Sequence, residues 1–356
     1  MGTARKLLVL GGGPVGLMAA ICARRNGLEA EVRSSVWPSQ EDAATLESVP
    51  SQTMALLVET GIFPRSVGVD KVFTEQVRQW DRSGPSRKMT TGRVHLSRPE
   101  LDIALLGLAE SLGVVLTPER IDRNTALEHA EDGKTVFDAS GRSSVTASAV
   151  SRPRRPIVGR QWLFETNEAT VATFGIGAGK DGYFYRMGNA HRICLGVVGN
   201  GALMRRVWPE VRAEVAEIAA WLIDDLPEEF AEIGRSGATT MQWSEGRRGP
   251  PQIGDAVVAQ DALSSQGLAV GLVDAVQSVL ALLGRPVTAS PADRSGTISS
   301  GRSLVAEIVA MSPFAGDQLW AEYLEFLRDD EWKISNPTRT GMNEVYPGYG
   351  LGLASS

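Results

Sequence analysis

The chain opens on two apolar runs of different spacing, separated by a cluster of glycines. Lys6 to Leu10 is a short apolar run, residues 11–16 read Gly-Gly-Gly-Pro-Val-Gly, and Leu17 to Ala23 continue at helical density. Gly27 is placed to end that helix, and Ala30 to Val32 resumes as a strand. These residues predict a strand, a tight turn, a helix and a second strand, which together form one βαβ unit.

The rest of the chain predicts short strands mixed with helices. A loop followed by a helix is expected over Ser39–Gly61, and strands are expected over Val72–Trp80, Val114–Leu116 and Thr135–Phe137. Alternating residues between Trp162 and Val198, with Gly188 and Asn189 at a turn, predict antiparallel sheet. Helices are expected over Arg98–Leu112, Pro209–Leu226, Ser265–Leu283 and from about Ser303 to Arg328.

This order of elements predicts an α/β fold with a Rossmann-type nucleotide-binding domain. We expect that domain to be discontinuous, made of residues 1–150 and 245–290. An inserted substrate domain, mainly antiparallel sheet, is expected over residues 151–244, and C-terminal helices and a tail over 291–356.

Composition excludes several classes of protein. The chain has 356 residues, of which 43% are hydrophobic and 22% charged, so it can bury a sizeable core. A formal charge of −6 leaves no broad basic field, so we expect no nucleic-acid partner. No run reaches the ~18 apolar residues of a membrane span, and we expect a cytoplasmic protein.

Cysteine and histidine usage indicates neither disulfides nor metal. Cys22 and Cys194 lie far apart in apolar surroundings, so we expect reduced core thiols in a reducing compartment. The three histidines have no close spacing and there is no CxxC pair, so we expect no metal site.

The glycine cluster matches the GxGxxG pattern of dinucleotide-binding turns at Gly11, Gly13 and Gly16. The first glycine allows the tight turn, the second lets a diphosphate approach backbone N–H groups, and the third lets helix and strand pack closely. The helix that follows points its positive end at such an anion. We therefore expect the turn, with Pro14 and Val15, to bind a dinucleotide; the alternative is an ordinary glycine turn.

The acid that usually holds the ribose hydroxyls is missing from its expected position at the end of the second strand. In register that position falls on Ser34. Either Ser34 makes the ribose contact, or Glu31 or Arg33 substitutes for it.

Four further segments carry a resemblance to a known superfamily. They are Leu46-Glu47-Ser48-Val49-Pro50, Arg98-Pro99-Glu100-Leu101-Asp102, Asp138-Ala139-Ser140-Gly141-Arg142, and Gly254-Asp255-Ala256 with the loop from Asp261 to Leu268. Together with the glycine turn, and in the same order, they resemble motifs of the FAD-dependent monooxygenase and flavin halogenase-like superfamily, which has the p-hydroxybenzoate hydroxylase fold. Leu46 and Ala262 depart from that pattern, where glycine and proline are usual.

The resemblance implies FAD as cofactor and assigns further contacts to it. Asp255 would contact the ribityl and diphosphate region, and Ser265, Gln266, Gly267 and Leu268 would start a helix over the flavin. Arg98 would pair with phosphate, for which a guanidinium suits better than an ammonium. Asp138 would be a further residue that contacts FAD.

Catalytic residues are harder to identify from sequence. Glu47 could bond a flavin nitrogen or be an acid at a helix start. His95 could donate a proton near the flavin or be a surface histidine. Tyr183, Tyr185, Trp80 and Trp243 could line an aromatic substrate pocket or belong to the core.

The activity that the resemblance implies is monooxygenation, in biosynthesis, of an electron-rich aromatic or amino-acid-derived substrate through a C4a-hydroperoxyflavin. The substrate would be a small molecule or a peptide-borne aromatic group. Electrons would come from NAD(P)H or from a partner flavin reductase, since only one glycine fingerprint is present.

Three alternatives stay open: a reductase or dehydrogenase of the geranylgeranyl reductase type, a flavin halogenase, and a non-catalytic FAD-binding homologue. The halogenase Trp-x-Trp-x-Ile-Pro motif is absent, and Lys71 lacks the surroundings of a halogen-delivering lysine.

Overall fold

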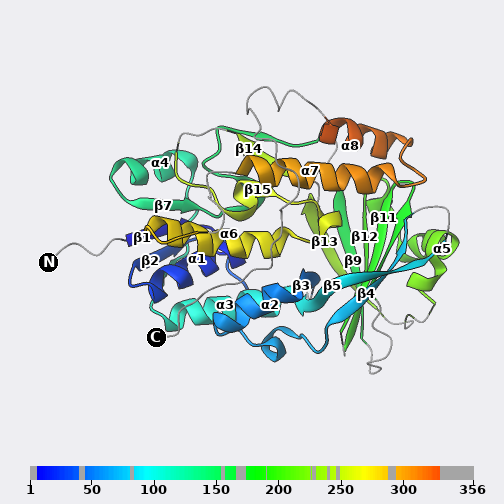
Figure 1. The fold of residues 1–356 in the computed structure, drawn as a ribbon, viewed down its shortest axis with the longest axis horizontal. Coiled ribbons are helices and arrows are strands. Elements are labelled where there is room, and N and C mark those ends of the chain that lie inside the picture. Colours follow the sequence, from blue (N-terminus) through cyan, green and yellow to red (C-terminus); the bar gives the residue numbers. More distant parts are fainter. Residues whose placement is uncertain are drawn as a thin grey trace.

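The computed structural model describes residues 6–39, 45–80, 84–153, 157–165, 174–189, 191–224, 226, 230–238, 241–245, 249–287 and 294–328. The predicted βαβ unit lies in a parallel sheet at one end of the molecule (Figure 1). Across this sheet the strands are β6 (Val115–Thr117), β2 (Glu29–Arg33), β1 (Lys6–Leu10) and β7 (Thr135–Asp138).

Helices cover both faces of the parallel sheet because its central strand is apolar on both sides. Leu7 and Val9 of β1 face one core, and Leu8 and Leu10 face another. The first core is shared with α1 (Pro14–Arg25), α2 (Ser51–Glu59), α3 (Arg98–Ser111) and α6 (Gly267–Leu282). The second is closed by α4 (Arg123–Glu131), a helix that sequence reasoning missed.

A larger mixed sheet forms the other end of the molecule (Figure 1). Its strands, in order, are β13 (Ala231–Ala238), β9 (Val158–Glu165), β12 (Arg192–Gly199), β11 (Gly182–Gly188), β10 (Gly175–Gly179), β4 (Phe73–Gln79), β5 (Ser86–Ser97) and β3 (Leu46–Pro50). Strands from both sides of the expected boundary at residue 150 thus share one sheet, and the β4–β10 pairing that joins them is parallel. α5 (Trp208–Ala219) covers one face.

Short elements connect the two ends. A three-stranded sheet contains β15 (Val258–Ala259), β14 (Gln242–Glu245) and β8 (Ala149–Ser151). Single 3-10 turns lie at η1 (Pro64–Val67), η2 (Gly141–Ser143), η3 (Leu203–Arg205), η4 (Ala220–Leu222), η5 (Gly254–Ala256) and η6 (Ala262–Ser264).

The single helix expected from about Ser303 to Arg328 is wrong. The segment forms two helices, α7 (Arg294–Ala310) and α8 (Gln318–Arg328), and Pro313 between them cannot supply the N–H that a continuous helix needs. Arg302 Nε donates to the carbonyl of Leu327 at 2.9 Å, so α8 folds back along α7. The prediction of a loop directly before α2 is also wrong, because Leu46–Pro50 form β3, which pairs antiparallel with β5. This pairing is non-local, so no local sequence pattern predicts it.

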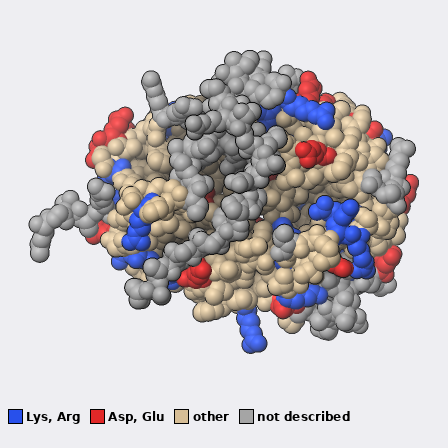
Figure 2. Space-filling model, viewed as in Figure 1, with Lys and Arg blue, Asp and Glu red and all other residues tan. Residues whose placement is uncertain are grey.

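Both cysteines are buried and unpaired. In the part of the chain that is described, no helix is long and apolar enough to cross a membrane, and no cluster of three potential metal ligands occurs. On the face shown in Figure 2, acidic and basic side chains are scattered among uncharged residues.

Candidate functional site

A cavity of about 750 Å³ runs from the glycine turn to the large sheet. Such a volume is within the range of roughly 300–1,000 Å³ that small-molecule sites occupy. Two parts of its lining differ in origin. The part expected to hold the cofactor, here called the cofactor end, is the turn after β1 with Ser34, Trp37 and Asp255. The part on the large sheet, here called the sheet wall, is made of Gln76, Gln161, Phe174, Ile176, Tyr183 and Tyr185.

The three motif glycines have different surroundings. A Cβ atom on Gly11 (φ +116°) would lie 2.3 Å from the Ala139 carbonyl oxygen, and one on Gly16 would lie 2.0 Å from the Gly11 carbonyl oxygen. A Cβ atom on Gly13 would meet no atom within 4 Å. Gly11 and Gly16 therefore permit close backbone packing, whereas Gly13 leaves space in the cavity lining.

That space suits an anion. α1 begins at Pro14 with Gly13 as its N-cap, and no side chain caps the first turn. Helix N-termini carry backbone N–H groups without intrahelical partners and a partial positive charge. The turn therefore fits a diphosphate. Gly11, Gly13, Pro14 and Val15 line the cavity, while Gly16 supports the turn from behind.

At the end of β2, Ser34 is the residue that reaches the cavity. Its hydroxyl also donates to the carbonyl of Val36 at 2.7 Å. Arg33 does not line the cavity, because its guanidinium is paired with Glu31 at 2.5 Å and with Glu119 at 2.9 Å. Of the three residues considered for the ribose, Ser34 lines the cavity, whereas Glu31 and Arg33 do not.

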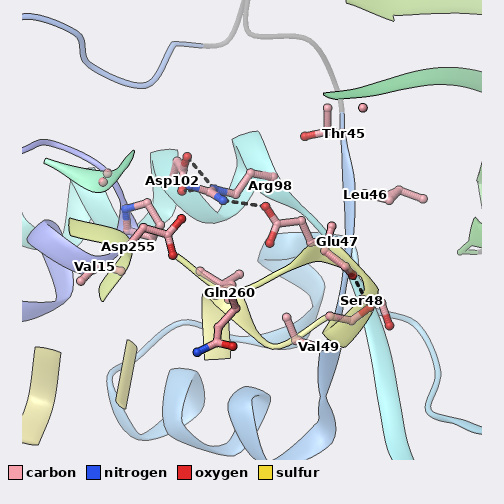
Figure 3. A pocket seen from close by; sticks show the side chains of 18 of the residues that line it. Val15, Thr45, Leu46, Glu47, Ser48, Val49, Arg98, Asp102, Asp255 and Gln260 are labelled. Atoms are coloured by element: carbon pink, nitrogen blue, oxygen red, sulfur yellow. Dashed lines mark hydrogen bonds and ion pairs between the residues drawn. The ribbon is translucent and has the colours of Figure 1, made fainter. Parts of the chain in front are cut away.

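Arg98 lies between two carboxylates that also line the cavity (Figure 3). Its Nη1 is 2.6 Å from Glu47 Oε1, and its Nε is 2.9 Å from Asp102 Oδ1. Burial disfavours the charge, but the two carboxylates outweigh that effect and raise the pKa of Arg98. A phosphate contact by Arg98 would have to compete with both acids.

Asp255 lines the same cavity and is drawn near Arg98 and Glu47 in Figure 3. Its carboxylate is 4.0 Å from Arg142 Nε, and burial raises the pKa of Asp255 more than Arg142 lowers it. The backbone N–H of Gly254 donates to Asp274 at 2.7 Å, and a Cβ atom on Gly254 would lie 2.9 Å from Val15 Cγ1. This close packing holds Asp255 beside the first turn of α1.

Asp138 does not line the cavity, contrary to the expected cofactor contact. It is fully buried, and its carboxylate accepts hydrogen bonds from the backbone of Ser140 (3.0 Å) and from both the backbone (2.8 Å) and hydroxyl (2.7 Å) of Thr146. Asp138 therefore shapes the segment Ala139–Arg142, which does line the cavity.

The loop before α6 places Ser265, Gly267 and Leu268 at the cavity, but not Gln266. Ser265 has a positive φ of +47°, which is costly for a residue other than glycine. Arg93 Nη2 donates to the Ser265 carbonyl at 2.8 Å and to the Ser48 carbonyl at 2.7 Å. Arg93 therefore connects the loop to β3, a role that no local sequence pattern predicts.

Two of the four predicted aromatic residues belong to the sheet wall. Tyr183 and Tyr185 line the cavity, whereas Trp80 and Trp243 do not. The indole N–H of Trp80 donates to the Ile308 carbonyl of α7, and Trp243 stacks on Phe326 of α8 at 5.2 Å between ring centroids. The two tryptophans anchor the C-terminal helices.

Glu47 and His95, the two residues considered as catalytic, lie in different parts of the structure. Glu47 lines the cavity and is paired with Arg98. His95 is buried outside the lining, stacks on Phe73 at 4.2 Å, and its Nδ1 lies 2.7 Å from the Gly188 carbonyl. Burial lowers the pKa of His95 to about 3, so the ring is neutral at physiological pH and is not placed to protonate a ligand.

Sequence reasoning missed several lining residues. Trp37 lies only three residues after Ser34 in the sequence, whereas no sequence pattern marked Gln161. Asp261 is buried at the cavity and accepts a hydrogen bond from the hydroxyl of Tyr323 on α8. The C-terminal helices thus reach the site through Tyr323.

No family model and no curated protein sequence matches this chain. Solved structures do match it. The peptidyl tryptophan dihydroxylase QhpG is 18% identical, with a TM-score of 0.65 over 90% of this chain and 79% of that one. The myxobacterial chondrochloren halogenase CndH is 16% identical, with a TM-score of 0.68 over 93% and 90%. PqsL of P. aeruginosa, solved with 2-aminobenzoylacetate, is 16% identical, with a TM-score of 0.59 over 91% and 99%.

These likenesses extend over nine-tenths of the chain or more. At such low identities they establish architecture rather than activity. The Rossmann-type α/β fold expected from the sequence is confirmed, and the chain has the fold shared by flavin-dependent halogenases and the tryptophan dihydroxylase QhpG.

Proposed function

We propose that this protein is an FAD-dependent monooxygenase acting on an electron-rich aromatic or amino-acid-derived substrate. The observation that carries the proposal is a single cavity that joins an uncapped glycine turn to an aromatic sheet wall. A dinucleotide with a planar ring system needs both parts: backbone donors for its phosphates and an enclosed, largely apolar space beside its ring.

The residues present fit FAD at each step along the cavity. The N–H groups of the glycine turn and of the first turn of α1 would hold the diphosphate, and Ser34 with Trp37 would meet the adenosine side. Asp255 would accept hydrogen bonds from ribityl hydroxyls, and Ser265 to Leu268 would cover the ring. Bound FAD would supply the oxygen chemistry.

The task left to the protein is to position the substrate and exclude water. Tyr183, Tyr185 and Phe174 provide an apolar wall against which an aromatic ring can lie. Arg98 stays charged between Glu47 and Asp102, and so fixes both acids at the cavity rim.

Halogenation is the main rival because several structures with this fold are halogenases. The halogen-delivering lysine that the superfamily resemblance would require has no candidate among the described residues lining the cavity. Lys71 instead lies over the Phe73 ring, 4.8 Å from its centroid and outside that lining. This arrangement favours oxygenation.

The source of electrons is a separate part of the proposal, with direct reduction by NAD(P)H slightly preferred over a partner flavin reductase. Anaerobic mixing of the FAD-loaded protein with NADPH is expected to bleach the flavin absorbance. An unchanged spectrum would assign reduction to a separate reductase.

The experiment that tests the function is turnover under labelled oxygen. The FAD-loaded protein, reduced photochemically or by NADPH, is exposed to ¹⁸O₂ with a panel of aromatic compounds and tryptophan-containing peptides, and products are examined by mass spectrometry. One labelled oxygen atom per product is expected. Reduced product without label would favour a reductase, a halogenated product in bromide would favour a halogenase, and a flavin-loaded protein that never consumes oxygen would favour a non-catalytic homologue.

A further inference from the structure

A row of residues crosses three strands of the large sheet at the cavity. Tyr185 of β11 is paired with Gly196 of β12, which is paired in turn with Gln161 of β9. A Cβ atom on Gly196 would lie 1.8 Å from the Tyr185 ring, so glycine is needed for the ring to cross this strand. The ring thereby reaches Gln161, whose Nε2 donates to the Tyr185 hydroxyl at 2.6 Å. The amide of Gln161 is held in a fixed place.

Two polar atoms of the sheet wall have no hydrogen-bond partner among the residues that the structure describes. They are Oε1 of Gln161 and the hydroxyl of Tyr183, and both are buried. A buried polar atom without a partner costs about 1–3 kcal/mol, and of the buried side chains with such an atom only Gln161 and Tyr183 line the cavity. Both residues line the cavity, so a bound molecule can supply what the protein lacks.

The chemistry of the two atoms is defined. Gln161 Oε1 is a carbonyl oxygen and can only accept a hydrogen bond, while the amide nitrogen donates one of its two hydrogens to Tyr185. Burial raises the pKa of Tyr183 well above its ordinary value, so the phenol keeps its proton and can donate. One acceptor and one donor therefore face the same space.

The sheet wall is also uncharged. Its members, as defined above, carry amide, phenol or hydrocarbon groups and no cation among the described residues. Arg93 lies behind Phe174, 5.8 Å from the ring centroid, and its guanidinium is bonded to Ser48 and Ser265. A carboxylate placed against this wall would lose water and meet no cation among the wall residues, and one hydrogen bond from the Tyr183 hydroxyl would not offset that loss.

We propose that Gln161 and Tyr183 determine substrate specificity, an inference that rests on the proposed function. Gln161 accepts a hydrogen bond from an N–H or O–H group of an uncharged aromatic ring, Tyr183 supplies a second hydrogen bond, and the wall rejects ring carboxylates. An indole side chain within a peptide has this chemistry, whereas an aromatic acid does not.

The test is a binding measurement on the FAD-loaded protein, followed by calorimetry or by perturbation of the flavin spectrum. The probes are indole, 1-methylindole, which lacks the N–H, and indole-2-carboxylate, which adds a charge. Indole is expected to bind about tenfold tighter than 1-methylindole, the effect of one satisfied buried hydrogen bond. It should also bind at least about tenfold tighter than indole-2-carboxylate, whose charge loses its water at the wall.

Two variants separate recognition from shape. In Gln161→Leu the indole to 1-methylindole ratio is expected to fall to about one. Tyr183→Phe should leave the binding of free indole unchanged, because indole carries no acceptor for the Tyr183 hydroxyl, and should weaken the binding of N-acetyltryptophanamide, which carries carbonyl acceptors, several-fold. Gln79→Leu is the matched control, because Gln79 is a sheet glutamine bonded to Trp221 at 2.7 Å outside the cavity lining. It should keep the full ratio.

Three results would overturn the inference: equal binding of indole and 1-methylindole by the unmodified protein, a ratio that persists in Gln161→Leu, or no binding of any probe at millimolar concentration. The proposed function is tested independently by ¹⁸O₂ incorporation. A protein that oxygenates substrates yet ignores the N–H group would refute only the specificity, and one that keeps the ratio but never uses oxygen would refute only the function.

Discussion

The cofactor end and the sheet wall enclose one cavity but are built by different means. The cofactor end is mostly backbone, where Gly11 and Gly16 allow close packing and Gly13 leaves room for a ligand. The sheet wall is made of side chains that separate strands bring together, such as Gln161 and Tyr185. Backbone N–H groups can bind any molecule with the same phosphates. The side chains of the sheet wall, in contrast, can be substituted without altering that backbone. On the proposed function, the difference assigns cofactor binding to one end and substrate choice to the other.

The largest expected effect concerns the packing behind the cofactor end. Gly16→Ala would place a methyl group 2.0 Å from the Gly11 carbonyl oxygen, where only backbone can move. The unfolding free energy should fall by about 4 kcal/mol, measured by urea denaturation. Gly107→Ala on α3 is the control, since its methyl would meet nothing within 4 Å, and it should gain about 0.5–1 kcal/mol. Similar stability of the two variants would contradict the packing argument.

Removal of the carboxylate at the cofactor end should affect ligand binding more than folding. Asp255→Ala is expected to weaken FAD binding by roughly 10- to 100-fold, the effect of losing hydrogen bonds to a charged group. Flavin fluorescence titration gives the affinity. Asp132→Ala, at an exposed position after α4, should bind FAD normally. Unchanged affinity in Asp255→Ala would remove that residue from the site.

The sheet wall should be the more acid-sensitive of the two regions because neutral His95 lies behind Phe174, 5.1 Å away between ring centroids. Its folded pKa of about 3 lies below the unfolded value of about 6.5, so the unfolded chain binds the proton first. This contribution is complete above pH 6.5 and is lost as the pH falls towards 3.

The stability difference between the unmodified protein and His95→Phe should therefore shrink by about 2 kcal/mol between pH 8 and pH 5. Denaturation curves at both pH values supply the comparison. A difference that does not change with pH would show that His95 is as easily protonated in the folded protein as in the unfolded chain.

The smallest effect should sharpen the contrast among the glycines themselves. Gly13→Ala introduces a methyl group into open space, so stability should stay within about 0.5 kcal/mol while FAD binding weakens about tenfold. Equal FAD affinity in Gly13→Ala and the unmodified protein would mean that no ligand approaches this turn closely.

The same contrast explains which parts of the site the sequence could reveal. The glycine turn, α1 and β2 follow one another in the sequence, so the spacing of the glycines and apolar residues predicts the βαβ arrangement directly. Strands β3 and β5 pair although almost fifty residues separate them in the sequence, so no local pattern predicted β3. The break between α7 and α8 contains a single proline within an otherwise helical pattern, and the sequence was therefore interpreted as one helix. Asp138 and His95 have residue types typical of active sites, but burial and their hydrogen bonds give them structural roles.

The most direct test of the account compares FAD with riboflavin, which has the same ring but neither diphosphate nor adenosine, in titrations of the flavin-free protein. We predict saturable binding of one FAD per chain, at least 100-fold tighter than riboflavin, because the glycine turn holds the part that riboflavin lacks. Equal affinity for the two flavins, or no saturable binding of either, would contradict the claim that this turn grips a dinucleotide.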